Sequence, residues 1–278
     1  MKEIDAFKEK VLKEYPRLKP DSVFRFDCHH GVACFNRCCG DVNIFLTPYD
    51  IIRLKNNLGI TSDDFLDRYT ITPFSKDSKF PVVLLRMEDD DRKSCPFNRP
   101  EGCSVYADRP WACRMYPLGV ASPGEGAEAI EEEFYFLLQE SVCRGFDDKK
   151  EWTIADYKRA QGVDDYDRNG EMFKHLTTHR YFGEGKMLSP EKMDMFYTVC
   201  YDIDNFRRFL FGSTFFSKFE VDDTTREKIK EDDVELLKFG YRWLRFALFG
   251  EKTMSVRSDA LAARREKLGA EGGSGSAS

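Results

Sequence analysis

The sequence predicts an α+β fold in which a loop-rich, cysteine-dense region with a small sheet precedes a mainly helical region. Eight of the nine cysteines lie in the first 143 residues, where turn-forming residues separate short apolar runs. From about residue 150, apolar residues recur at helical spacing over longer stretches. We therefore expect a metal-binding cysteine-cluster domain at 1–150 and a helical region at 151–268 that packs on it. The Gly/Ser-rich tail at 269–278 is interpreted as an added linker.

The first region begins with two predicted helices. Residues 1–20 have the charge and apolar pattern of a short amphipathic helix that ends at Pro20. Thr47 can cap a second helix with Pro48 in its first turn and Asp50 in the third position of a capping box. Gly59 can end that helix in a left-handed conformation.

Shorter elements follow. A helix can start at Thr61 or Ser62 and continue through DDFLDRY. The apolar, β-branched run at 80–87 favours a strand before the acidic turn EDDD. Residues 114–140 indicate a hairpin, because RMYPLGVA and EEFYFLLQ flank a segment rich in Gly and Pro.

The second region is predicted to be helical. Thr153 is a candidate N-cap for TIADYKRAQGV, and EMFKHLTTHRYF follows it at 171–182. A longer helical pattern opens at Ser189-Pro190, and residues 232–250 repeat the same texture.

The cysteines point to metal rather than to disulfides, because the chain shows no export signal and the cytosol keeps thiols reduced. A four-thiolate zinc site or an iron–sulfur cluster usually takes ligands from a tight turn and from a second segment that closes the cage. Residues 28–39 supply the turn as C-x5-C-x3-C-C, and a Pro-rich segment supplies the rest. The predicted metal ligands are Cys28, Cys34, Cys38, Cys39, Cys95, Cys103, Cys113 and Cys143.

Cys38 and Cys39 are the unusual feature of this pattern. Neighbouring side chains on an extended backbone point to opposite sides, so each thiol could face a different metal centre. We therefore expect one or two centres, with the adjacent pair as the hinge if there are two. The spacing leaves open how the eight thiols divide.

The kind of metal is also left open by charge, because a zinc ion and an oxidised four-iron cluster carry the same net charge with four thiolates. We expect Arg109 and Arg114 to lie at the cofactor, where they would offset thiolate charge. The lack of a mixed-ligand zinc pattern favours a 4Fe-4S iron–sulfur cluster, with zinc as the alternative. His29 and His30 are interpreted as surface or supporting residues, and Cys200 as a buried structural thiol.

The motifs C-x5-C-x3-CCG, LTPYDIIRL, CPF, CSVYADRPWACRMYP and C-x-G-F resemble the YkgJ-type cysteine-cluster family, described as zinc- or iron-chelating proteins. The resemblance spans residues 24–147 and implies a cysteine-ligated metal site. Flagellin lysine N-methylases carry a similar cluster, so the resemblance also allows a protein lysine methyltransferase that uses S-adenosylmethionine. The C-x3-C-x2-C spacing of radical S-adenosylmethionine enzymes and a glycine-rich nucleotide fingerprint are not found.

These observations favour a cytoplasmic iron–sulfur protein that acts in electron transfer or in a maturation or modification reaction. The alternatives are a zinc-stabilised module that binds a protein and the methyltransferase. A protein partner or protein substrate is expected in each case. The net charge of -6 opposes sequence-independent nucleic-acid binding, and no apolar run is long enough for a membrane span. Enzymatic activity and catalytic residues are not assigned.

Overall fold

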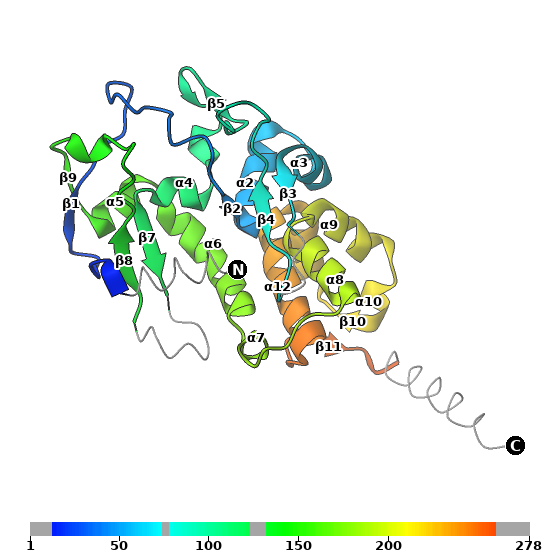
Figure 1. Cartoon of the computed structure of the whole chain (residues 1–278). Helices are drawn as coiled ribbons and strands as arrows, with labels where there is room; N and C mark the ends of the chain where they lie inside the picture. The colour runs from blue at the N-terminus through cyan, green and yellow to red at the C-terminus, as the bar shows by residue number, and fades with distance from the viewer. Residues whose placement is uncertain (1–12, 74–77, 123–131, 260–278) are drawn as a thin grey trace, which may run out of the picture. The chain divides into compact units, whose positions relative to one another are not determined.

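The protein comprises two compact units, Met1–Leu188 and Ser189–Ser278, in a computed structural model that describes residues 13–73, 78–122 and 132–259 (Figure 1). Helices and small sheets alternate with long loops, which confirms the α+β class. The helices that directly follow residue 150 belong to the first unit. The division into regions at 1–150, 151–268 and 269–278 stays a prediction.

The first unit contains most of the strands. Its elements are β1 (Val23–Arg25), β2 (Phe45–Leu46), α2 (Pro48–Leu58), α3 (Ser62–Tyr69), β3 (Thr70–Ile71), β4 (Val83–Leu85), β5 (Asn98–Arg99), β6 (Gly102–Cys103), the 3-10 helix η1 (Tyr106–Asp108), α4 (Trp111–Met115), β7 (Leu118–Ala121), β8 (Phe134–Leu137), η2 (Gly145–Asp147), β9 (Glu151–Thr153), α5 (Ile154–Ala160), α6 (Val163–Thr177) and α7 (Arg180–Gly183). All strand pairs in the described residues of this unit are antiparallel: β1 with β9, β4 between β2 and β3, β5 with β6, and β7 with β8. The sheets are small, so turns and side-chain contacts hold much of this unit.

Helix α2 forms as its sequence predicts. Thr47 and Asp50 make the reciprocal capping box, and Pro48 lies in the first turn. Gly59 ends the helix with φ 65°, a left-handed conformation that glycine adopts without a steric penalty. The N-caps predicted at Thr61 and Thr153 are also present, on α3 and α5.

Three sequence predictions need comment. Residues 1–12 lie outside the described residues, but the predicted first helix stops before Pro20, because Leu18 instead bridges to Tyr135 of β8. The strand predicted at 80–87 is limited to the three residues of β4, where all three side chains are buried. The predicted hairpin is confirmed by β7 and β8, although its turn lies outside the described residues.

The core of the first unit lies beside the cysteine-rich loops. Phe24 and Phe26 flank the end of β1, and their rings meet Tyr157 of α5 edge to face. Met115 of α4 joins the same cluster, and Cys143 packs against it from a loop. The apolar core therefore reaches segments that carry the predicted ligands.

The second unit is mainly helical, as the sequence predicts. It comprises α8 (Pro190–Cys200), α9 (Ile203–Gly212), α10 (Phe215–Lys218), β10 (Phe219–Glu220), α11 (Asp223–Glu231), α12 (Asp233–Phe249) and β11 (Ser255–Val256). Helix α12 packs against α8, α9 and α11 (Figure 1). Across the ranges described, none of the helices has both the length and the apolar character required to cross a bilayer.

Candidate metal centre

The first cysteine-rich loop, residues 27–40, is a chain of tight turns rather than a strand or helix (Figure 1). Four backbone amides donate to the carbonyl three residues earlier: Val32 to His29, Phe35 to Val32, Arg37 to Cys34 and Cys39 to Asn36. Asn36 takes a positive φ of 63°, which reverses the chain before the adjacent cysteines. The loop thus folds back on itself and gathers its thiols.

This turn changes the interpretation of Cys38 and Cys39. The sequence argument assumed an extended backbone, on which the two side chains would diverge. In the turn they instead lie together, and a hydrogen bond with Cys39 lowers the pKa of Cys38 while raising that of Cys39. Cys38 and Cys39 therefore lie next to each other in space as well as in sequence.

The segment around Cys95 is joined to this turn by backbone pairing. The Cys95 amide donates to the Cys39 carbonyl at 2.8 Å, and Gly40 forms an isolated antiparallel bridge with Ser94. A Cβ atom on Gly40 would lie 2.7 Å from the Arg92 carbonyl oxygen, so only glycine permits this close approach. The pairing brings Cys95 beside Cys39.

Cys103 and Cys113 come from the segment that follows. Cys103 is in β6 and pairs with Asn98 of β5, whose amide donates to the Cys95 carbonyl at 2.9 Å. Cys113 lies in α4, close enough to Cys95 and Cys103 for their charges to raise its pKa. A hairpin and a short helix therefore present these three thiols to one another.

Cys143 is brought to the first loop by pairing at its other end. The Asp27 amide donates to the Gly145 carbonyl at 3.0 Å, and the Arg144 amide donates to Cys34 Sγ at 3.0 Å. Gly145 has no room for a side chain, since a Cβ would lie 2.6 Å from the Phe26 ring. The last predicted ligand, far along the chain, thus joins the first three.

Four thiols line one small cavity that is partly open to solvent. We call Cys28, Cys34, Cys38 and Cys143 the first thiol group. Burial raises the pKa of Cys28 to about 11, and the charges of the other three thiols act in the same direction. Mutual repulsion of this kind is relieved when a cation binds, because metal binding favours deprotonated thiols.

The remaining four predicted ligands form a second neighbourhood. We call Cys39, Cys95, Cys103 and Cys113 the second thiol group. Burial raises the pKa of Cys113 to about 12, and Cys95, the buried Asp50 and Cys103 add to the effect. The structure thus divides the eight thiols into two groups of four that meet at Cys38 and Cys39.

The hydroxyl of Tyr116 indicates whether the cavity at the first thiol group suits a metal centre. This hydroxyl is buried beside the Cys143 thiol, and burial followed by a hydrogen bond with Cys143 raises the pKa of this tyrosine. Thiolate or sulfide sulfur in the cavity would accept from it, so the lining fits a cysteine-ligated metal centre.

The spacing of the thiols also bears on the kind of group. A tetrahedral zinc ion with Zn–S bonds of about 2.3 Å needs its sulfur atoms roughly 3.8 Å apart. Within residues 13–73, 78–122 and 132–259, no three Cys, His, Asp or Glu side chains are gathered tightly enough to hold one ion. Of the two groups, the first lines a small cavity.

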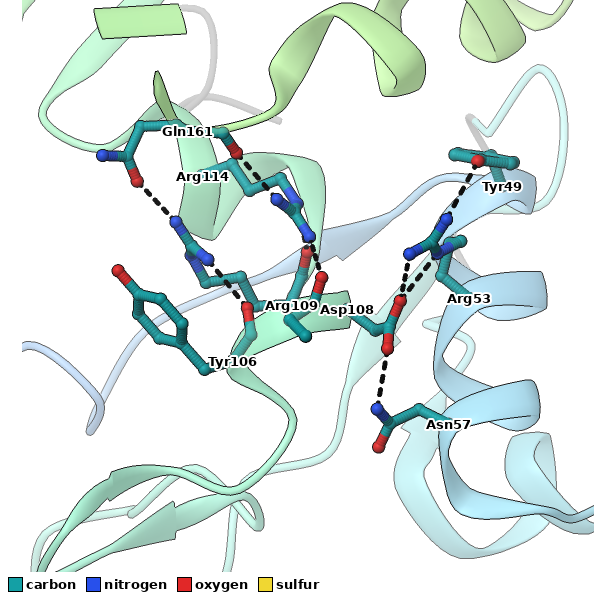
Figure 2. Close-up of polar contacts among 9 residues, drawn as sticks. Tyr49, Arg53, Asn57, Tyr106, Asp108, Arg109, Arg114 and Gln161 are labelled. Atoms are coloured by element: carbon teal, nitrogen blue, oxygen red, sulfur yellow. Dashed lines mark hydrogen bonds and ion pairs between the residues drawn. The ribbon is translucent and has the colours of Figure 1, made fainter. Parts of the chain in front are cut away.

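Arg109 and Arg114 are both buried but bond mainly to the protein itself (Figure 2). Arg109 donates to the Tyr106 carbonyl and to the side chain of Gln161. Arg114 donates to the carbonyls of Gln161, Arg109 and Ala107. Arg109 also lowers the pKa of Cys103 and Cys113 against the dominant effect of burial. A role of Arg109 and Arg114 at the cofactor stays a prediction. Their hydrogen bonds hold the segment that carries Cys103 and Cys113 in place.

Two acidic residues that the sequence analysis did not assign to the site fasten the same segment. Asp108 accepts from Arg53 and from Asn57 of α2 (Figure 2). Asp50 is fully buried and accepts at 2.7 Å from the amide of Trp111, which begins α4 two residues before Cys113. The capping-box position identified Asp50 as a helix cap, but its contact with Trp111 joins residues far apart in the sequence.

The remaining candidate ligands have other contacts. His29 accepts from the Gly31 amide and lies 3.5 Å from Asp148, and the His30 ring lies against Phe35. Cys200 is 1% exposed in the second unit, which confirms its interpretation as a buried thiol.

Residues 27–159 match the model of a family whose description reads "CxxCxxCC: Putative zinc- or iron-chelating domain". This match contains all eight predicted ligands and confirms the resemblance to the cysteine-cluster family. The family description supports a cysteine protein that binds zinc or iron. Searches of curated proteins and of solved structures gave no match.

Proposed function

We propose that this protein binds two cysteine-ligated iron–sulfur clusters, one at each thiol group. The observation that carries the proposal is the division of eight thiols into two groups of four that meet at Cys38 and Cys39. Four thiolates are the usual ligand set of a 2Fe-2S or 4Fe-4S cluster. Two such sets joined through one peptide bond account for the adjacent cysteines.

The surroundings of the first thiol group support iron–sulfur over zinc. The Tyr116 hydroxyl lies beside Cys143, where it could donate to sulfur, and hydrogen bonds to cluster sulfur are a common means of tuning an iron–sulfur centre. An all-thiolate donor set also binds structural zinc, which remains the alternative metal.

Electron transfer is the activity that this arrangement supports best. Two redox centres whose ligands are neighbours in the chain would exchange electrons over a short path, while one of them lies at a cavity open to solvent. A maturation or modification reaction would use the same property. In our proposal the protein works in the cytoplasm, where thiols stay reduced, and passes electrons to a protein partner or protein substrate.

Metal and acid-labile sulfide content, with an absorption spectrum, test the proposal on full-length protein purified without oxygen. Iron and sulfide in similar amounts, with broad absorbance near roughly 400 nm, are expected for iron–sulfur clusters. Zinc without sulfide or colour in the same preparation would contradict the iron–sulfur proposal and favour the zinc-stabilised module.

A further inference from the structure

The two thiol groups differ in how far solvent reaches them. In the first thiol group Cys28 is itself exposed, and Cys143 lies between the exposed residues Val142 and Arg144. Arg37, which also lines the cavity, is exposed. A dissolved molecule can therefore approach this group without any opening of the fold.

The second thiol group is held by buried neighbours. Cys95 is followed by Phe97, which is 3% exposed. Cys113 is followed by Arg114 and Met115, which are 6% and 1% exposed. All four thiols of this group are partly buried, and none is exposed as Cys28 is, so a dissolved molecule reaches this group less readily than the first.

The two groups also differ in how their chain segments are fixed. Three ligands of the first thiol group lie on one loop of turns without a helix or strand. The second thiol group is supplied by the β5–β6 hairpin, by α4 and by the backbone bond from Cys95 to Cys39. Asp50 fixes α4 from a fully buried position. Local fluctuation will therefore open the first group more often than the second.

We propose that the first thiol group holds an exchangeable centre and the second thiol group a retained one. This inference rests on the proposed pair of centres and assigns a different role to each of them. Small anionic ligands, such as soluble chelators, reach the first centre at the exposed Cys28, and the exposed Arg37 attracts them to the same loop. The second centre stays bound and stabilises the fold while the first one reacts.

The kinetics of metal release test this inference. Anaerobic full-length protein is mixed with excess pyridylazoresorcinol, an anionic chelator that gives coloured complexes with both iron and zinc. We expect two phases of similar amplitude, with rates that differ on the order of tenfold or more, because local fluctuation opens the loop of the first thiol group more often than the second group. A single phase would overturn the inference.

Variants assign the phases. Cys143→Ser is expected to remove the fast phase and to keep the slow one, and Cys113→Ser the reverse. Cys28→Ser repeats the first test at an exposed position if Cys143→Ser fails to fold. Arg37→Glu should slow the fast phase alone, and Cys200→Ser in the second unit should change neither. A fast phase that survives both Cys143→Ser and Cys28→Ser would also overturn the inference.

The metal content of each sample before chelation separates this inference from the proposed function. Zinc in place of iron refutes the iron–sulfur proposal, yet unequal release from two sites still supports the inference. One metal centre per chain refutes both. Two iron–sulfur centres that are released together keep the proposed function and refute only the unequal roles.

Discussion

Gly40 shows how much of the site depends on a single residue. It directly follows the adjacent cysteines and forms the bridge to Ser94 that brings Cys95 to Cys39. The carbonyl of Arg92 occupies the space where any other residue would place its Cβ. Glycine is therefore required here by close backbone packing rather than by flexibility.

Gly40→Ala should separate the two paired segments and weaken the second thiol group. We expect a loss of about 1–3 kcal/mol in the free energy of unfolding, the usual cost of forcing a carbon atom into a filled space. Metal content should fall, with the loss confined to the slow phase of release.

Gly170→Ala is the matched control for this change. Gly170 lies inside α6, and a Cβ there meets nothing within 4 Å. Alanine at this position should stabilise the helix by about 0.4–1 kcal/mol and leave the metal content unchanged. If Gly40→Ala behaves like Gly170→Ala in thermal unfolding and metal analysis, the close approach does not matter to the site.

Among the secondary-structure elements, the contact between α2 and α4 fixes the position of α4. Asp50 accepts from Thr47 at the start of α2 and from Trp111 at the start of α4. Burial raises its pKa from 3.8 to about 6, although these hydrogen bonds and Arg114 act in the opposite direction. The ionised carboxylate is therefore costly in the folded protein.

Asp50→Asn tests this contact through its dependence on pH. Because the folded state holds the proton more tightly, the stabilising contribution of Asp50 is full below about pH 3.8 and is lost as pH rises to about 6. Relative to the wild type, Asp50→Asn should therefore gain stability between these pH values, on the order of 3 kcal/mol in total, and the difference should be constant above pH 6.

The measurement is urea unfolding of the two proteins at several pH values, with metal content followed in each sample. Asparagine has one acceptor oxygen where aspartate has two, so a pH-independent loss of about 1–3 kcal/mol accompanies the change. A stability difference that does not vary with pH would show that Asp50 titrates normally in the folded protein.

The elements themselves were largely predictable, and the reason is local chemistry. Thr47, Pro48, Asp50 and Gly59 specify the ends of α2 within a dozen residues, and the structure has the same ends. The early end of the first predicted helix was missed, because the pairing of Leu18 with Tyr135 joins distant parts of the sequence. Local propensity does not report such pairings.

The whole site illustrates the same limit. The eight cysteines could be recognised from their spacing, but their division depends on two long-range backbone contacts, Asp27 with Gly145 and Cys39 with Cys95. Each contact requires a glycine, Gly145 in the first and Gly40 in the second, and the sequence alone does not show why glycine is needed there. The extended backbone assumed at Cys38 and Cys39 was wrong, because Asn36 reverses the chain before them.

The two units are stabilised in different ways. The second unit builds its core from paired helices, whereas the cysteine-rich part of the first unit has short strands and many turns. Metal binding supplies folding free energy where regular structure is sparse. We therefore expect the first unit to depend on its metal, and we propose that its eight thiols make two centres that meet at Cys38 and Cys39.

The most direct test is the metal content per chain of the wild type, Cys143→Ser and Cys113→Ser, prepared in parallel without oxygen. The account predicts that each variant loses about half of the metal, because each change removes one ligand of one four-thiolate centre and leaves the other intact. Loss of all metal in both variants would contradict the account and indicate a single centre shared by the eight thiols.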